Sequence, residues 1–328
     1  QNNSGSFVKT GYTFTGWNTQ ANACGTHYDT GATFAMGAAN ITLYAHWTNL
    51  DMTFDPGTGA NDIVIAIAIQ NDDKILIGGR FTSYNGTARN RIARLDTDAS
   101  LDTSFSSDAN TDVYAIAVQS NGQILIGGSF ELYNGSSRNA IARINPSNGS
   151  VDATFNPGLG PGGGGVFSPR ITDIAIQTDG NILAGGRFTS FNGAAQRHIV
   201  RLYTGGGVDG SFSGLDDERV TCIAVQDDGQ ILIGGDSFST SYDGVSRNRI
   251  ARLDTDGTLD TSFDPGTGFD YAVNVIAVQS DHKILVGGSF NSYNGTTKNN
   301  IIRLNDDGSI DPSFNSGTGA NFGVNDIA

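Results

Sequence analysis

The stretch KILIGGRFTSYNGTARNRIARL, residues 74–95, decides the fold, because the chain repeats it four more times. The copies are QILIGGSFELYNGSSRNAIARI (123–144), NILAGGRFTSFNGAAQRHIVRL (181–202), QILIGGDSFSTSYDGVSRNRIARL (230–253) and KILVGGSFNSYNGTTKNNIIRL (283–304). Their glycine pairs begin at residues 78, 127, 185, 234 and 287, so successive copies lie 49, 58, 49 and 53 residues apart. A period near 50 residues indicates a repeat architecture rather than an ordinary globular fold.

Each repeat consists of four short pieces that are typical of β-strands. They are an apolar run such as DIVIAIAIQ (62–70), the KILIGG step, the RIARL step and a final LDTSF or a variant of it. The pieces are rich in β-branched residues and bounded by Asn, Asp and Gly, and no helical period is present. The first piece is apolar on both faces, as expected for a sheet stacked between two others. The pattern predicts an all-β protein, a β-propeller of four-stranded antiparallel blades.

One arginine and one aspartate recur in every repeat, eight or nine residues apart. Folding the chain at the turn between the third and fourth pieces places the two residues opposite each other on one face of the sheet. We therefore predict a structural ion pair in each blade rather than a ring of ligand-binding charges. The predicted pairs are Arg94–Asp102, Arg143–Asp152, Arg201–Asp209, Arg252–Asp260 and Arg303–Asp311.

These units resemble the delta-60 repeat family, whose mark is an apolar strand, a GG-x-F step, an NG turn, IARL and LDxSF. The resemblance covers residues 50–328. It implies a β-propeller module of a large secreted or surface-exposed bacterial protein, and it implies no catalytic residues.

The N-terminal part resembles a second family. KTGYTFTGWNTQANACGTHYDTGATFAMGAANITLYAHWT (9–48) is similar to the second half of an internalin-type B-repeat, the Listeria–Bacteroides repeat. That resemblance implies a small, partial β-grasp-like module of the kind found on bacterial surface proteins. We therefore expect two domains, a partial B-repeat module at 1–48 and a propeller at 49–328. The propeller is expected to hold five recognisable repeats, with incomplete repeat pieces at both ends.

The incomplete pieces leave the size of the ring open. LDMTF (50–54) has the form of a fourth piece, and GTGANFGVNDIA (317–328) matches the start of a first piece, GTGANDIVIAIAIQ (57–70). A five-blade ring would leave both pieces over, and a six-blade ring would lack the middle of its last blade. Two explanations fit: the chain is an excerpt of a longer array, or spare edge strands pair between molecules in a polymer.

Composition excludes several classes of partner. The net charge is −14, so a nucleic-acid backbone or an anionic lipid would be repelled. No apolar run approaches the roughly 18 residues of a membrane span, so we expect no direct membrane insertion in this segment. Cys24 and Cys222 lie in different predicted domains, so we expect no disulfide between them, and they show no zinc-binding spacing.

Motifs for catalysis or cofactors are weak. GLGPGG (158–163) matches a nucleotide-binding pattern but lacks the strand–helix context, so it is better explained as an insertion between blades. The four histidines lack metal-ligand spacing, and no GxSxG motif occurs. DTDG (254–257) and NDDG (305–308) leave weak calcium binding open, although Asx turns explain them more simply. We expect no catalytic, cofactor or metal residues.

Aromatic residues recur in the loop after the second strand, where loop length also varies between repeats. These are Tyr84, Tyr133, Phe191, Tyr242 and Tyr293. Variable loops on a rigid scaffold often bind ligands, so these residues form a candidate binding rim. The alternative is that each aromatic side chain covers its own blade.

Together these features predict a non-catalytic, secreted or cell-surface modular protein of a bacterium. Its expected role is adhesion, display, or filament and scaffold assembly. The expected partner is a glycan or protein ligand on a surface, or neighbouring copies or domains of the same protein. The alternative function is a propeller enzyme that acts on extracellular polysaccharide; polar residues that break the symmetry of the repeats and converge on one pocket would favour it.

Overall fold

A computed structural model describes residues 13–19, 27–29, 42–48, 53–163, 168–212, 219–236, 245 and 247–327. Its contacts divide the chain into two units, Gln1–Pro56 and Gly57–Ala328. Every regular element among the described residues is a β-strand, and the propeller fold predicted from the repeats is confirmed.

The N-terminal unit contains one small antiparallel sheet. Its strands are β1 (Thr13–Asn18), β2 (His27–Asp29) and β3 (Tyr44–Thr48), in the order β2-β1-β3. A bulge interrupts the pairing of β1 with β3 between Phe14 and Gly16. Phe14 and Trp17 pack edge to face, with ring centroids 5.3 Å apart, which is a favourable aromatic geometry.

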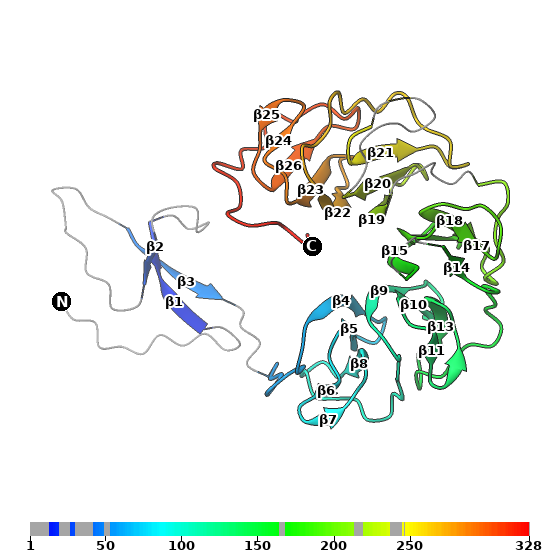
Figure 1. Cartoon of the computed structure of the whole chain (residues 1–328). Coiled ribbons are helices and arrows are strands. Elements are labelled where there is room, and N and C mark those ends of the chain that lie inside the picture. The colour runs from blue at the N-terminus through cyan, green and yellow to red at the C-terminus, as the bar shows by residue number, and fades with distance from the viewer. Residues whose placement is uncertain are drawn as a thin grey trace. The chain divides into compact units, whose positions relative to one another are not determined.

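The described residues of the larger unit form five three-stranded antiparallel sheets, called blades 1 to 5 in chain order (Figure 1). Blade 1 comprises β4 (Val64–Ile69), β5 (Ile75–Gly79) and β8 (Ile92–Leu95). Blades 2 and 3 comprise β9 (Val113–Val118), β10 (Ile124–Gly128) and β13 (Ile141–Ile144), then β15 (Arg170–Ile176), β16 (Ile182–Arg187) and β18 (Ile199–Leu202). Blades 4 and 5 comprise β19 (Val220–Val225), β20 (Ile231–Gly235) and β21 (Ile250–Leu253), then β22 (Val273–Val278), β23 (Ile284–Gly288) and β26 (Ile301–Leu304).

Among the described residues, short strand pairs form after the second strand in blades 1, 2 and 5, and in blade 3 the strand after the second one pairs with a strand that precedes the blade. They are β6 (Ser83–Tyr84) with β7 (Thr87–Ala88), β11 (Leu132–Tyr133) with β12 (Ser136–Ser137), β14 (Pro161–Gly162) with β17 (Ser190–Phe191), and β24 (Ser292–Tyr293) with β25 (Thr296–Thr297). Part of the GLGPGG insertion is thus itself paired, through β14.

The prediction of four strands per blade is not confirmed, since the described sheets of the blades have three strands each. The fourth piece makes only a single antiparallel bridge to the end of the third strand, as Leu101 does to Leu95. The aspartate that follows ends the strand, because its side chain starts a turn: Asp102 Oδ1 accepts hydrogen bonds from the Ser104 main-chain nitrogen at 2.9 Å and from its hydroxyl at 2.6 Å. Such Asx turns compete directly with a sheet ladder.

The two glycines of each GG pair have different tasks. A Cβ on the first would stand 2.7 Å from Ile171 Cγ2 of the next blade at Gly127, or 2.6 Å from Val220 Cγ1 at Gly185. A Cβ on the second would overlap a main-chain carbonyl oxygen of its own first strand, as Gly128 shows against Asp112. The first glycine therefore allows the neighbouring blade to pack closely. The second glycine permits the β-bulge between the first and second strands of its own blade.

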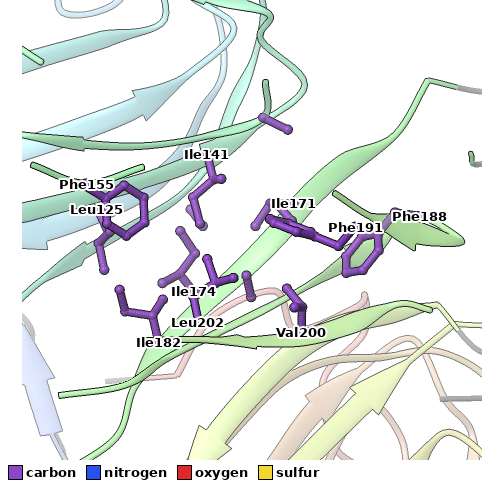
Figure 2. Packing of buried hydrophobic residues seen from close by; sticks show 13 residues of the cluster. Leu125, Ile141, Phe155, Ile171, Ile174, Ile182, Phe188, Phe191, Val200 and Leu202 are labelled. Atoms are coloured by element: carbon purple, nitrogen blue, oxygen red, sulfur yellow. The ribbon is translucent and has the colours of Figure 1, made fainter. Parts of the chain in front are cut away.

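Among the described residues, four of the five hydrophobic clusters join neighbouring blades, and the fifth belongs to blade 1 alone. One cluster joins Leu125 and Ile141 of blade 2 to Ile171, Ile174 and Ile182 of blade 3, all 7% exposed or less. Figure 2 shows these side chains lying between the strands of the two blades. Because each blade contributes to the core of its neighbour, burial couples the blades into one structure.

Candidate functional site

An arginine and an aspartate meet in every blade, at the end of the third strand. The N···O distances of Arg94–Asp102, Arg143–Asp152, Arg201–Asp209, Arg252–Asp260 and Arg303–Asp311 are 2.8, 2.7, 2.7, 2.6 and 2.7 Å. None of the aspartate side chains is more than 10% exposed. The guanidinium also lies over the phenylalanine that follows the aspartate, 4.4 Å from the ring centroid for Arg94 over Phe105. The structure brings all five predicted pairs together.

These contacts shift the titration of the aspartates. For Asp209, burial opposes ionisation, but hydrogen bonds from Ser211 and Arg201 outweigh it and hold the pKa well below its ordinary range. For Asp311, hydrogen bonds from the Ser313 backbone and hydroxyl, together with Arg303, lower the pKa to about 2. A pKa that folding lowers contributes stability above the ordinary aspartate value, and that contribution is lost as the pH falls.

The sequence did not predict that the same arginine also reaches the next blade. Its remaining donors bond carbonyl oxygens in the turn between the third and fourth pieces of the following repeat. The contacts are Arg94 to Pro146 O and, at 3.0 Å, to Ser147 O; Arg143 to Thr204 O at 2.6 Å; Arg201 to Thr255 O; and Arg252 to Asp306 O at 2.7 Å. We call these four the inter-blade arginine contacts. Charge-assisted bonds of this kind are stronger than neutral ones.

The inner strands surround a cavity of about 290 Å³. Two or three residues of each inner strand line it, and the C-terminal segment contributes two more. The first position holds Ile65, Tyr114, Thr172, Thr221, Asn274 and Asn325, and the second holds Ala66, Ala115, Asp173, Cys222, Val275 and Asp326. Isoleucines at the next position also line the cavity in four blades, namely Ile67, Ile116, Ile223 and Ile276. The symmetry of the repeats is broken by the polar side chains of Thr172, Asp173, Thr221, Asn274, Asn325 and Asp326, which have apolar or aromatic counterparts in blades 1 and 2.

Several of these polar side chains are used to join neighbouring blades. Thr172 Oγ1 donates to Val220 O at 2.7 Å, Thr221 Oγ1 to Val273 O at 2.6 Å, and Asn274 Nδ2 to Val324 O at 3.3 Å. The acceptor is always the carbonyl at the same position in the next inner strand. Near the axis, as at the arginines, hydrogen bonds thus run from one blade to the next.

Asp173 is the most perturbed carboxyl group of the cavity. Its Oδ2 accepts from the main-chain nitrogen of Ile223 in the next blade at 2.7 Å, and its Oδ1 from that of Ile174 at 2.8 Å. Burial raises the pKa of Asp173 to about 6, aided by the charge of Asp326, although the two main-chain donors act in the opposite direction. A perturbed carboxyl group in a cavity is a typical candidate for chemistry.

Cys222 stands beside this carboxyl group on β19. It is a buried free cysteine. Burial raises the pKa of its thiol, and the charge of Asp173 adds to the shift. A thiol that resists ionisation is a poor nucleophile, so Cys222 fills space against Gly234 rather than reacting.

Replacing Asp173 with alanine is expected to change how stability depends on pH. Alanine fits, because Ala66 and Ala115 occupy the same position in blades 1 and 2. The folded pKa of Asp173 lies above the ordinary 3.8, so the wild-type chain loses stability between about pH 4 and pH 6 as this group is forced to ionise. We expect urea unfolding to show Asp173→Ala gaining about 1 to 3 kcal/mol relative to wild type from pH 4 to pH 7. An equal difference at both pH values would contradict the assignment.

The candidate binding rim of aromatic residues is not supported where the structure describes it. Tyr84, Tyr133, Phe191 and Tyr293 are 3% exposed or less. The three tyrosine hydroxyls donate to carbonyl oxygens of their own blade, as Tyr133 does to Gly149 at 2.9 Å. Each side chain covers its own blade, because the short hairpin folds back over it. Tyr242 lies outside the described residues.

The acidic turns also bond internally. Asp256 accepts from the Thr258 nitrogen and hydroxyl, and Asp307 accepts likewise from Ser309. Within the described ranges, no group of three or more His, Cys, Asp or Glu residues could hold a metal ion. The described part of the chain also contains no helix that could span a bilayer.

Known proteins resemble short or divergent parts of this chain. A Gly-rich protein of Evansella cellulosilytica, named as a membrane protein, is 58% identical over 40 residues, which cover 12% of this chain and 5% of that protein. The extracellular domain of a Bacteroides thetaiotaomicron protein, named as a one-component system, is 15% identical, with a TM-score of 0.47 over 80% of this chain and 30% of that one. Virginiamycin B lyase of Staphylococcus aureus is 14% identical, with a TM-score of 0.45 over 77% and 71%.

Family models match both units. Residues 1–46 match the Listeria-Bacteroides repeat domain. Residues 70–105, 119–155, 177–212, 226–263 and 279–314, more than half of the chain, match the family described as "Domain of unknown function (DUF5122) beta-propeller". Neither match carries the narrower names delta-60 or internalin-type, which stay predictions. The chain therefore belongs to the DUF5122 β-propeller family.

Proposed function

We propose that this chain is a rigid display module of a secreted or cell-surface bacterial protein, acting in adhesion or in scaffold assembly. Its task is to hold surface loops and neighbouring modules in fixed positions. The ligand is a glycan or a protein on a surface, or a neighbouring copy or domain of the same protein.

The inter-blade arginine contacts carry this proposal. The most regular polar group of the repeat has its donors committed to its own aspartate and to the next blade's turn. Because the apolar cores also lie between blades, the repeated side chains stabilise one stiff ring. Stiffness is what a display module needs, and loops on such a scaffold are the usual place for recognition.

Two further observations support a location outside the cell. The Listeria-Bacteroides repeat shares this chain with the propeller, and a relative over a short segment is named as a membrane protein. The net charge of −14 also favours solubility and disfavours binding to anionic polymers.

Protease shaving of intact producer cells tests this location. We expect trypsin to release peptides of residues 74–304 before lysis, while peptides of a cytosolic marker protein appear only after lysis. Release of both sets only after lysis would contradict the surface assignment.

One observation favours the alternative, a propeller enzyme that acts on polysaccharide. Asp173, with its pKa of about 6, and Asp326 line the same symmetry-breaking cavity, and two carboxyl groups are the usual pair for glycoside hydrolysis. Reducing-sugar release from extracellular polysaccharides by wild type, Asp173→Asn and the exposed control Asp227→Asn separates the two functions. The display proposal predicts no turnover by any of the three. Turnover by wild type and Asp227→Asn that Asp173→Asn abolishes would establish the enzyme.

A further inference from the structure

The inner strand of blade 1 has an apolar face that is covered in every later blade and exposed here. Val64 is 37% exposed, whereas its counterparts Val113, Ile171, Val220 and Val273 are fully buried. Ile67 is 65% exposed, whereas its counterparts Ile174, Ile223 and Ile276 are 7% exposed and Ile116 of blade 2 is half-buried. In blades 2 to 5 the preceding blade covers these positions. An exposed apolar face of this size marks an interaction surface.

Blade 5 carries the complementary surface at the other end of the series. Arg303 bonds Asp311, Gln279 and Ser313 of its own blade. Its side chain is 21% exposed, against 4% for Arg252, which also reaches Asp306 in the next blade. The guanidinium of Arg303 is thus placed to donate a hydrogen bond to a carbonyl oxygen in the turn of a following blade.

The C-terminal segment already takes the first position of a further blade. The Val324 nitrogen donates to Gly288 O at 2.9 Å, and Asn274 donates to Val324 O. A Cβ on Gly287 would meet Val324 Cγ1 at 2.6 Å. Val324 therefore sits against the first glycine of blade 5 just as Val220 sits against Gly185 in blade 3. Figure 1 shows this segment returning from blade 5 toward the axis.

We propose that the space between blade 5 and β4 takes one more β-sheet unit of this same repeat, continued from Val324–Ile327. The interfaces between the existing blades predict which residues that unit must contain. Its second strand needs a glycine where it faces Val64 and Ile67, because Gly78, Gly127 and Gly185 of the second strands receive the corresponding pair of the next blade, and Gly234 receives Val273.

Its third strand needs an arginine that reaches the turn of blade 1. Thr97 holds the position that Thr204, Thr255 and Asp306 hold in blades 3 to 5, where the carbonyl accepts from the arginine of the preceding blade. Thr97 is exposed. The sixth unit thus meets the apolar face of β4 with a glycine of its second strand. It meets the turn of blade 1 with an arginine of its third strand.

Extending the chain tests this directly. Ala328 aligns with Ala277, so a copy of residues 278–314 is added after Ala328. Hydrogen exchange is then measured by mass spectrometry on the whole extended chain. We expect exchange of the Val64–Ile69 amides to slow by about tenfold or more, to the level of β9, and the added segment to resist proteolysis.

The matched control is the same extension carrying Gly287→Leu in the copied segment only. Its side chain would collide with Val64 and Ile67, so we expect no slowing at β4, while protection of blades 2 to 4 shows that the rest of the ring is folded. Equal slowing by both extensions, or by neither, would overturn the proposal. So would a dimer of the unextended chain in which β4 is already protected, because a second copy would then fill the space.

Discussion

Replacing Arg252 with methionine is expected to lower the free energy of unfolding by about 3 to 5 kcal/mol, the usual cost of removing one partner of a buried ion pair. Arg252 is 4% exposed, pairs with Asp260 at 2.6 Å and donates to Asp306 O at 2.7 Å. Methionine keeps much of the packing but leaves the buried Asp260 carboxylate without its cation. Urea unfolding at pH 7 measures the loss, and a loss below about 1 kcal/mol would contradict a structural role for the pair.

The same change at Arg303 is the internal control. Arg303 holds the same place in blade 5 and pairs with Asp311 at 2.7 Å, but it is more exposed, and the contacts described for it lie within its own blade. Lys283 Nζ, 3.8 Å from Asp311, also compensates part of the lost charge. We therefore expect Arg303→Met to cost no more than about half as much. Equal costs would show that the contact with the next blade contributes nothing.

Replacing Gly128 with alanine is the second change with a large expected effect. The added methyl group would overlap the Asp112 carbonyl oxygen and stand 2.9 Å from Phe130 Cδ1. The carbonyl cannot move freely, because it accepts a hydrogen bond from the Ser129 nitrogen at 3.0 Å. We expect a loss of about 3 kcal/mol in urea unfolding, at the upper end for overpacking.

Gly210→Ala supplies the control for this prediction. A Cβ at Gly210 has no neighbour within 4 Å among the described residues, so its cost should stay within about 0.5 kcal/mol. Similar costs at Gly128 and Gly210 would mean that the glycine pairs are not required by close approach of the backbone.

The sequence predicted most of the fold because the repeats display the same strands five times. The pairing of Arg94 with Asp102 followed from the length of the turn between them, which is a local signal. The fourth strand is not confirmed, because LDTSF has strand composition while Asp102 begins a turn through its side chain. For Tyr133 the sequence left two possibilities open, exposure on a binding rim or burial over its own blade. Burial follows from the way its hairpin folds back over the blade.

The stacking of apolar sheet faces was predicted, but the hydrogen bonds between blades could not be, since their partners lie about one repeat apart and leave no local pattern. Arg252 and Asp306, for example, are 54 residues apart in the sequence. The cavity did leave a signal that sequence reasoning missed. Thr172 and Asp173 occupy the two positions that hold the apolar residues Ile65 and Ala66 in the first repeat. Such polar replacements in an otherwise regular repeat indicate residues with a role other than core packing.

In this structure the arginine contacts couple each blade to the next. Hydrogen exchange of the Arg252→Met and Arg303→Met variants tests this coupling. We expect Arg252→Met to accelerate exchange in both Ile231–Gly235 of blade 4 and Ile284–Gly288 of blade 5, whereas Arg303→Met accelerates exchange in blade 5 alone. An effect of Arg252→Met that is confined to blade 4 would show that the arginine does not couple the two blades.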